Sequence, residues 1–531
     1  MAKRAALLSV FVLLLLPCTA LAQGYPQRRQ VNQVPVDDPV IKAIWDEGMD
    51  HSQIYNLAQT LADSIGPRLP GSPQFDAGAA WALKLFDSWG IEGRKDEYGT
   101  WKAWERGPTH VDLIAPRVRS LDGIMQAWSA GTNGPVTGEA VVVPPISSPA
   151  ELDAFLETVK GKFVLLTIAE PTCRPAADWE EWATPASLEK MQALQAENRT
   201  RSRQRFEDIG LDQNETIRRF EAAGVAGILS GAWTGNWGAT RVMAARNQVA
   251  PNIVMGCEDY GLVYRLAENG QGPMLRVDAQ AKDLGTAPTY NIIGEIRGTE
   301  LPDQYVILSA HFDSWDSGSG ATDNNSGTVT MLEAARILRQ AYPHPKRTIL
   351  VGLWNGEEEG LNGSRAFVAD HPDIVANVQA LFNQDNGTGR VVNISMQGLT
   401  GVAGFMGEWM TAIPTQISQE IRLQIPGTPG TGGSDYSSFV CASVPAFSLS
   451  SLSWSYRQTY HNPTDTFDKV IIDDIMNNAT LTAMLTYLAS EEPERLPRDQ
   501  RVMGINARTG EPGAWPQCRA PARNDSEYFI R

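Results

Sequence analysis

Short apolar runs alternate with amphipathic segments along the C-terminal half of this chain. Residues 305–310, 348–354 and 380–383 are mostly apolar and have the length of buried strands. The segment that begins at Ser326 instead repeats its apolar residues at helical spacing, with Met331 the first of them. This alternation predicts an α/β fold with a mixed, largely parallel sheet sandwiched by helices.

The N-terminal part has a different pattern. Residues from about 38 to 110 are predicted to be mainly helical, with a turn at residues 66–72. A helix is expected from about Gln74 to Trp89, where Gly90 supplies a C-terminal cap. We therefore assign residues 23–129 to an N-terminal helical part of the main domain.

The middle of the chain, residues 130–284, is predicted to be a separate unit. Short strands are expected at Val136–Val143 and Gly161–Leu166, and a helix end followed by a strand at Ala222–Leu229. The charged stretch between them, about 177–219, is expected to be helical and exposed. Residues 285–495 then form the main catalytic domain, and residues 496–531, rich in Pro, Gly and Arg, a tail that wraps the surface.

Residues 1–22 have the pattern of a secretory signal peptide. Lys3 and Arg4 precede an apolar run at residues 5–16, and Ala20-Leu21-Ala22 supplies a cleavage site before Gln23. The apolar run is too short to span a bilayer, and no other stretch of the sequence could do so. The sequence thus predicts export to the periplasm or the extracellular space, with no membrane span after cleavage.

The net charge limits the binding partners that the chain can have, and the cysteine content bears on the disulfide bonds expected in an oxidising compartment. The formal net charge is −16, which argues against nucleic acid or an anionic membrane as the main partner because both require basic patches. Cleavage would leave four cysteines, Cys173, Cys257, Cys441 and Cys518, which allow three disulfide pairings that the sequence leaves open. The oligomeric state is open as well.

Histidine and carboxylate residues follow the predicted strands at the points where those strands end. His311 ends the first, Glu357 and Glu358 follow the second, and Asp385 follows the third. The carboxyl ends of parallel strands meet at one edge of a sheet, where sites form. Only six histidines occur in the chain, and one more, His461, lies far downstream. Imidazole and carboxylate are zinc ligands, so the sequence predicts a metal site at this edge.

These motifs together resemble peptidase family M28, the co-catalytic zinc aminopeptidases. The matching segments are His311-Phe312-Asp313, Asp323-Asn324, Glu357-Glu358-Glu359-Gly360, Asp385 and His461, in the order typical of that family. His311-Phe312-Asp313-Ser314-Trp315-Asp316 is especially similar to its carboxypeptidase Q-like branch. Residues 130–284 resemble a mainly-β protease-associated domain inserted into the peptidase.

The resemblance implies a role for each of these residues. His311 and Asp385 would bind one metal ion and Glu358 and His461 the other, while Asp323 would bridge both and precede a cis peptide bond to Asn324. The other three assignments follow the same resemblance: Glu357 as general base, Asp313 as hydrogen-bond acceptor that fixes the tautomer of His311, and Tyr460 as a hydrogen-bond donor to the oxyanion. Two Zn²⁺ ions are implied, with Co²⁺ or Mn²⁺ as substitutes.

The implied activity is hydrolysis of terminal bonds of peptide substrates by metal-activated water, most simply at a free N-terminus. A dipeptidase or carboxypeptidase of the same family is an alternative that needs a cation for the substrate carboxylate, such as Arg422 or Arg457. Two further alternatives are a single-zinc enzyme that cyclises an aminoacyl terminus, as glutaminyl cyclases do, and a non-catalytic receptor. Ser434-Asp435-Tyr436 departs from the family pattern, which has His in the third position.

Overall fold

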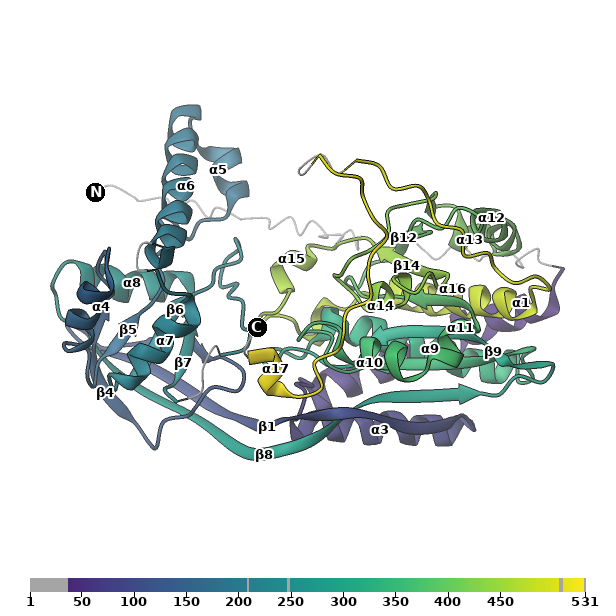
Figure 1. The fold of residues 1–531 in the computed structure, drawn as a ribbon, viewed down its shortest axis with the longest axis horizontal. Helices are drawn as coiled ribbons and strands as arrows, with labels where there is room; N and C mark the ends of the chain where they lie inside the picture. The colour runs from purple at the N-terminus through teal and green to yellow at the C-terminus, as the bar shows by residue number, and fades with distance from the viewer. Residues whose placement is uncertain (1–36, 208–209, 246–248, 506–509, 530–531) are drawn as a thin grey trace, which may run out of the picture.

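A computed structural model of the chain describes residues 37–207, 210–245, 249–505 and 510–529. Two lobes lie side by side, and the long strands β1 (Glu92–Ala115) and β8 (Met274–Ile296) run through both (Figure 1). The larger lobe contains the strand ends predicted to form the metal site. The predicted signal peptide at residues 1–22 lies outside the described residues.

The sheet of the larger lobe is mixed, with a parallel centre. Its strands follow the order β13-β12-β14-β11-β9-β10-β8, and β14, β11, β9 and β10 are parallel neighbours. This arrangement confirms the predicted fold class. The other strands are β9 (Leu301–His311), β10 (Arg347–Trp354), β11 (Val378–Asn383), β12 (Val391–Ser395), β13 (Arg422–Gln424) and β14 (Ala446–Ser451).

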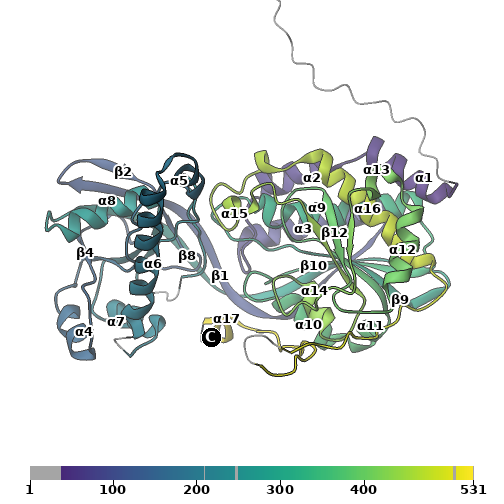
Figure 2. The same cartoon turned by 90° about the horizontal axis from the view of Figure 1, so that it is seen from above.

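Helices cover both faces of this sheet because its central strands are apolar on both sides (Figure 2). Alternate residues of β9 divide between the faces, so Val306 and Leu308 join one hydrophobic cluster and Ile307 joins the other. The first face is covered by α1 (Pro39–Trp45), α2 (Ile54–Gln59), α3 (Pro73–Trp89), α9 (Ser326–Ala341), α12 (Ala403–Ala412) and α16 (Ile472–Glu491), and the second by α10 (Asn362–Asp370), α11 (Pro372–Ala376) and α14 (Tyr436–Val440). The short helix α13 (Thr415–Ser418) also packs on the first face, through Ile417, and two further short helices are α15 (Tyr456–Thr459) and α17 (Asp525–Phe529).

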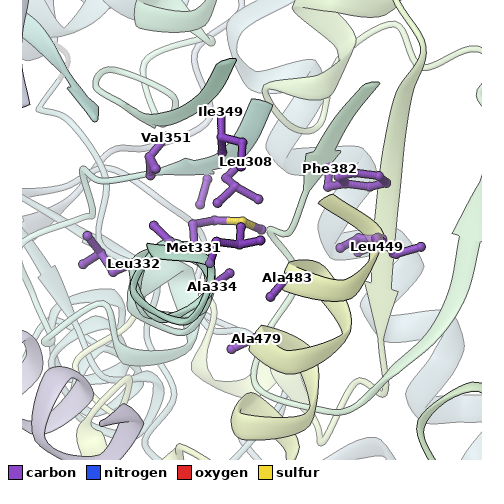
Figure 3. Close-up of a cluster of buried hydrophobic side chains, with 14 of the residues drawn as sticks. Leu308, Met331, Leu332, Ala334, Ile349, Val351, Phe382, Leu449, Ala479 and Ala483 are labelled. Atoms are coloured by element: carbon purple, nitrogen blue, oxygen red, sulfur yellow. The ribbon is translucent and has the colours of Figure 1, made fainter. Parts of the chain in front are cut away.

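The core between the sheet and helices α9 and α16 fixes the position of the loop that precedes α9. Leu308 of β9, Met331 of α9 and Ala483 of α16 are fully buried and belong to one cluster (Figure 3). Small residues on α16 let this helix pack closely against α9. A largely buried ion pair ties α9 to the N-terminal segment after α1, because Arg336 of α9 bonds Glu47 as well as Glu333 of its own helix, at 2.9 Å each. The N-terminal end of α9 is therefore held rigidly beneath the ends of β9 and β11.

The prediction of a mainly helical segment over residues 38–110 was wrong beyond residue 91. The helix α3 ends at Trp89 with Gly90 in the left-handed region (φ 69°), as predicted, but Glu92 begins the 24-residue strand β1. This strand pairs antiparallel with β8 along nearly its whole length, with register shifts such as the one between Glu97 and Gly99. Its partner lies almost 200 residues away in sequence, so local periodicity could not reveal the pairing.

The smaller lobe is α/β rather than mainly β, which corrects that part of the prediction. Its strands follow the order β4-β5-β6-β7-β3, and the β4–β5, β5–β6 and β6–β7 pairs are parallel. Parallel neighbours require crossover connections, which here include helices. The strands are β2 (Arg119–Leu121), β3 (Gly123–Met125), β4 (Val136–Val142), β5 (Phe163–Leu165), β6 (Gly227–Gly231) and β7 (Asn252–Met255); the helices are α4 (Pro149–Leu156), α5 (Ala176–Trp182), α6 (Pro185–Glu207), α7 (Gln213–Ala222) and α8 (Cys257–Glu268). Its likeness to a protease-associated domain stays a prediction.

Two disulfide bonds resolve the pairing that the sequence left open. Cys173 is bonded to Cys257 within the smaller lobe, and Cys441 is bonded to Cys518 in the larger one. The second bond ties the C-terminal tail to the end of α14. Among the described residues, no helix is both long and apolar enough to cross a membrane.

A histidine that joins α10 to β1 predicts a pH dependence of stability. His371 lies 3.1 Å from the Asp96 carboxylate, and this hydrogen bond raises the pKa of His371 above its ordinary value of 6.5. Because the folded pKa is the higher one, the stabilisation is complete below about pH 6.5 and is lost as the pH rises through the folded pKa. We expect His371→Gln to lower the free energy of unfolding by about 0.5–1 kcal/mol near pH 6 and by less near pH 9, measured by urea unfolding.

His110→Gln, at an exposed position on the same strand, is the matched control. A His371→Gln protein whose loss of stability is equal at both pH values would contradict the role of this pair.

Candidate metal centre

The carboxyl ends of three adjacent strands deliver the predicted residues to one edge of the sheet. His311 is the last residue of β9, the Glu357-Glu358 pair follows β10, and Asp385 follows β11. Because β10, β9 and β11 are parallel neighbours, these side chains emerge at the same edge. Asp323 arrives from the loop before α9, and His461 from the loop after α15.

His311, Asp323 and Asp385 form a first group of close donor atoms. The Nε2 atom of His311 lies 3.2 Å from Asp323 Oδ1 and 3.1 Å from Asp385 Oδ1. A single imidazole nitrogen carries at most one proton, so it cannot donate to both carboxylates with full strength. The three side chains together form a pocket of oxygen and nitrogen donors suited to a divalent cation.

Asp323, Glu358 and His461 form a second group around the other oxygen of Asp323. His461 Nε2 lies 3.2 Å from Asp323 Oδ2 and 2.8 Å from Glu358 Oε2. Asp323 belongs to both groups, with one carboxylate oxygen facing each histidine. All five predicted metal ligands therefore converge from distant parts of the chain.

Several of these nitrogen and oxygen atoms make no hydrogen bond, which leaves their lone pairs free to bind a metal ion. Both ring nitrogens of His461, Oδ2 of Asp323 and Oε1 of Glu358 are buried, and despite the short distances none of them has a partner with the geometry of a hydrogen bond among the described residues. Buried polar atoms without partners are rare in folded proteins, because each one loses its hydration without compensation. Neutral imidazole and carboxylate oxygens are zinc ligands, so this donor set fits two such ions that share Asp323.

Asp465 holds the shared ligand in place and was missed in the sequence. Its carboxylate accepts hydrogen bonds from the backbone N–H groups of Thr322, at 2.7 Å, and Asp323, at 3.1 Å. The peptide bond between Asp323 and Asn324 is cis, as the family resemblance implied. Asp465 follows His461 by four residues, and this spacing was the one signal that could have connected the two.

Asp313 has a partly different role from the one predicted. The Nδ1 atom of His311 lies 3.0 Å from the backbone carbonyl of Asp313 and 3.6 Å from its carboxylate. The backbone carbonyl is thus the nearer partner that orients the ring. The Asp313 carboxylate instead accepts the backbone N–H groups of Glu357, at 3.3 Å, and Glu358, at 3.2 Å. It positions both glutamates at once.

Burial raises the pKa of two carboxyl groups beside the centre, those of Glu357 and Asp435. Burial is the main cause at Glu357, whose pKa lies well above its ordinary value, and the negative charges of Asp385 and Asp435 act in the same direction. Asp435, in the segment that departs from the family pattern, is fully buried with no hydrogen-bond partner for either carboxylate oxygen among the described residues. Burial is also the main cause that raises its pKa, to about 7. Sequence reasoning did not identify Asp435.

Aromatic rings enclose the second histidine. The Tyr460 ring is stacked on His461 with the centroids 3.5 Å apart, and Trp315 lies 5.8 Å from the same imidazole. Tyr460 thus lies beside the predicted ligand, but its contact is through the ring face. Its role as an oxyanion donor stays a prediction.

Comparison with known proteins gives consistent matches. The model of "Peptidase family M28" matches residues 291–486. Carboxypeptidase Q from Xenopus laevis is 26% identical over 501 residues, which cover 93% of this chain and 98% of that protein. Human carboxypeptidase Q is 24% identical over 457 residues, covering 85% and 88%.

Solved structures share the fold. A peptidase M28 precursor from Shewanella amazonensis superimposes with a TM-score of 0.63 at 21% identity, covering 86% of this chain and 97% of that one. A zinc aminopeptidase from Bacillus subtilis gives a TM-score of 0.53 at 19% identity, covering 84% and 96%. The family match spans the strand ends described above. Residues 291–486 thus match peptidase family M28, and together with the carboxypeptidase Q relatives this match identifies the chain as a peptide-bond hydrolase.

Proposed function

We propose that this protein is an exported two-zinc exopeptidase that removes residues from the free N-terminus of short peptides. The observation that carries the proposal is the position of Asp323, whose two carboxylate oxygens lie 3.2 Å from Nε2 of His311 and of His461. Metal ions about 3.5–4 Å apart in two-metal hydrolases are held by a shared ligand of this kind. The similarity to a zinc aminopeptidase from Bacillus subtilis supports zinc as the metal and the N-terminus as the end of the peptide that is cleaved.

The chain's own residues divide between two ion positions. His311 and Asp385 would hold one ion, Glu358 and His461 the other, and Asp323 both. Three carboxylates offset three of the four positive charges of two Zn²⁺ ions, which leaves the centre attractive to a further anionic or electron-rich ligand. When bound, the ions would lower the pKa of a water molecule toward neutrality and polarise the scissile carbonyl.

Glu357 is the proton carrier in this proposal. It adjoins the ligand Glu358 and its backbone N–H is held by Asp313, so its backbone is fixed beside the centre. A carboxylate at this position could accept the proton of the attacking water and then pass it to the departing amine. Breaking the C–N bond without this transfer would expel an unstable amide anion.

The smaller lobe would restrict access to this centre. It touches the metal-binding loop directly, because the backbone N–H of Val242 donates to the carbonyl of His461 at 2.8 Å. A lobe attached at this point leaves little room for a folded protein substrate. Short peptides are therefore the proposed substrates.

The proposed function can be tested with two substrates, one with a free N-terminus and one with a blocked N-terminus. An aminoacyl anilide with a free amine should be hydrolysed, whereas a dipeptide with a blocked N-terminus should not, because the free amine is the group recognised. Initial rates on both compounds with zinc-loaded protein provide the comparison. Hydrolysis of the blocked dipeptide at an equal rate would contradict the aminopeptidase assignment.

Glu357→Gln should keep both metal ions and lose turnover by about 10²–10⁴-fold, since the amide cannot carry the proton. Metal content by elemental analysis and kcat on the aminoacyl anilide are the two measurements. The matched control is Glu408→Gln, at an exposed position on α12, which should behave as the unchanged protein. Normal turnover in Glu357→Gln would remove this residue from the mechanism.

His461→Ala should bind one zinc ion fewer than the unchanged protein, because the second group keeps only two carboxylates. Equilibrium dialysis with zinc gives the stoichiometry, and His110→Ala, at an exposed position, is the control. Unchanged stoichiometry would contradict the ligand role. A single equivalent of zinc in the unchanged protein would instead favour the cyclising alternative.

A further inference from the structure

The loop that follows β9, residues 312–320, lies between the smaller lobe and the second histidine of the metal centre. Trp315 in this loop packs against Trp128, which follows β3 of the smaller lobe, with the ring centroids 6.1 Å apart. The same indole packs against the imidazole of His461, with the centroids 5.8 Å apart. One side chain of the 312–320 loop is therefore in contact with the smaller lobe and with a proposed metal ligand.

An ion pair joins this loop to the smaller lobe. The Arg106 guanidinium on β1 donates from Nε to Asp316 Oδ2 at 2.8 Å and from Nη2 to Asp316 Oδ1 at 2.7 Å. The remaining terminal nitrogen of Arg106 donates to the backbone carbonyl of Met125, the last residue of β3. Both charged side chains are largely buried, so the pair is screened little by solvent. A bidentate contact fixes orientation as well as distance, and here it holds the 312–320 loop against β3.

His461 needs support from its surroundings to stay in place. Its φ of 57° lies in the left-handed region, which a residue with a side chain keeps only where neighbouring contacts hold it. The smaller lobe provides one such contact, because the backbone N–H of Val242 donates to the carbonyl of His461 at 2.8 Å. The 312–320 loop provides others: Trp315 packs on the ring, and a Cβ atom on Gly318 would lie only 2.7 Å from the carbonyl oxygen of Asn462.

We propose that Arg106 is a positioning residue, which acts through the 312–320 loop to hold His461 in the orientation that binds the second zinc ion. The inference rests on the proposed function, in which the centre holds two zinc ions. The affinity for the second ion then depends on the smaller lobe, although all five proposed ligands belong to the larger one.

The first ion should depend much less on this contact. His311 ends β9 and Asp385 follows β11, so the central strands of the sheet place both of these ligands. The start of the 312–320 loop is also held within the larger lobe, because Nε of Arg68 donates to the carbonyl of Phe312 at 2.6 Å. Loss of the Arg106 contact should therefore weaken the two ions unequally.

The affinity for zinc tests the proposal. Titration of the zinc-free protein with zinc, in competition with a chelator, should give two dissociation constants, and Arg106→Gln should raise that of the second ion about 10–100-fold. In a His461→Ala background, which binds only the first ion, Arg106→Gln should leave the remaining constant unchanged. An equal loss in both backgrounds would overturn the proposal.

The sign of the change separates positioning from a simple effect of charge. Arg106→Gln removes a positive charge near the centre, and by charge alone this change would tighten zinc binding. The proposal requires weaker binding instead, so tighter or unchanged binding would contradict it. Arg106→Lys keeps the charge without the planar fork of donors, and it should restore only part of the affinity. If Arg106→Gln did not fold, Arg106→Lys would give the same comparison with the unchanged protein.

Arg119→Gln is the matched control. It removes the same charge from the smaller lobe and breaks another arginine–aspartate ion pair, the one with Asp259 at 2.7 Å. Arg119 lies on β2, and its partner lies on α8, so neither contacts the 312–320 loop through this pair. Both zinc dissociation constants should stay unchanged in this variant.

Chemical modification gives a second measurement that needs no zinc. Diethyl pyrocarbonate, which modifies accessible imidazole, should react with His461 severalfold faster in zinc-free Arg106→Gln than in the zinc-free unchanged protein, with mass spectrometry of peptides locating the site. His311, which is fully buried, is the internal reference. Equal rates at His461 would overturn the positioning role. A single bound zinc ion in the unchanged protein would contradict the proposed function, while the modification rate would still test Arg106.

Discussion

The placement of one carboxylate between two imidazoles is the constraint on which this molecule depends. Asp323 lies within hydrogen-bonding distance of two histidines that come from opposite ends of the catalytic domain. Burying this group together with Glu358 and Asp385 is unfavourable unless positive charge compensates them. The unpartnered nitrogen and oxygen atoms around Asp323 indicate that bound cations supply this charge.

The surrounding structure holds this carboxylate rigidly. Asp465 accepts the two backbone N–H groups at Asp323, and Asp313 accepts the two at the glutamate pair. Two carboxylates outside the ligand set thus fix the backbone on which the ligands stand. The packed core of α9 and α16 supports the same loop from below. Ligand positions are therefore set by backbone that cannot move independently of the core.

The smaller lobe contacts the metal centre directly. The long β1–β8 pair joins the lobes (Figure 1), and the backbone N–H of Val242 in the smaller lobe donates to the carbonyl of His461. A metal centre alone would distinguish peptides poorly, because every peptide has a carbonyl and an amide. Any further selection among peptides would have to come from the residues around the centre, including those of the smaller lobe.

The sequence by itself determined the order of strands and helices in the catalytic domain, the strand-end positions of His311, Glu358 and Asp385, and the family. These depend on local periodicity and on motifs, which a single sequence contains. The tertiary structure decided the rest: strand β1, the α/β character of the smaller lobe, the two disulfide pairs, and the position of Asp465 beneath the shared ligand. Each of these features depends on contacts between residues that are far apart in the sequence, and the local pattern of apolar and polar residues does not show such contacts. Asp465 is the clearest example, because its hydrogen bonds to the backbone of Thr322 and Asp323, more than 140 residues earlier in the sequence, exist only in the folded chain.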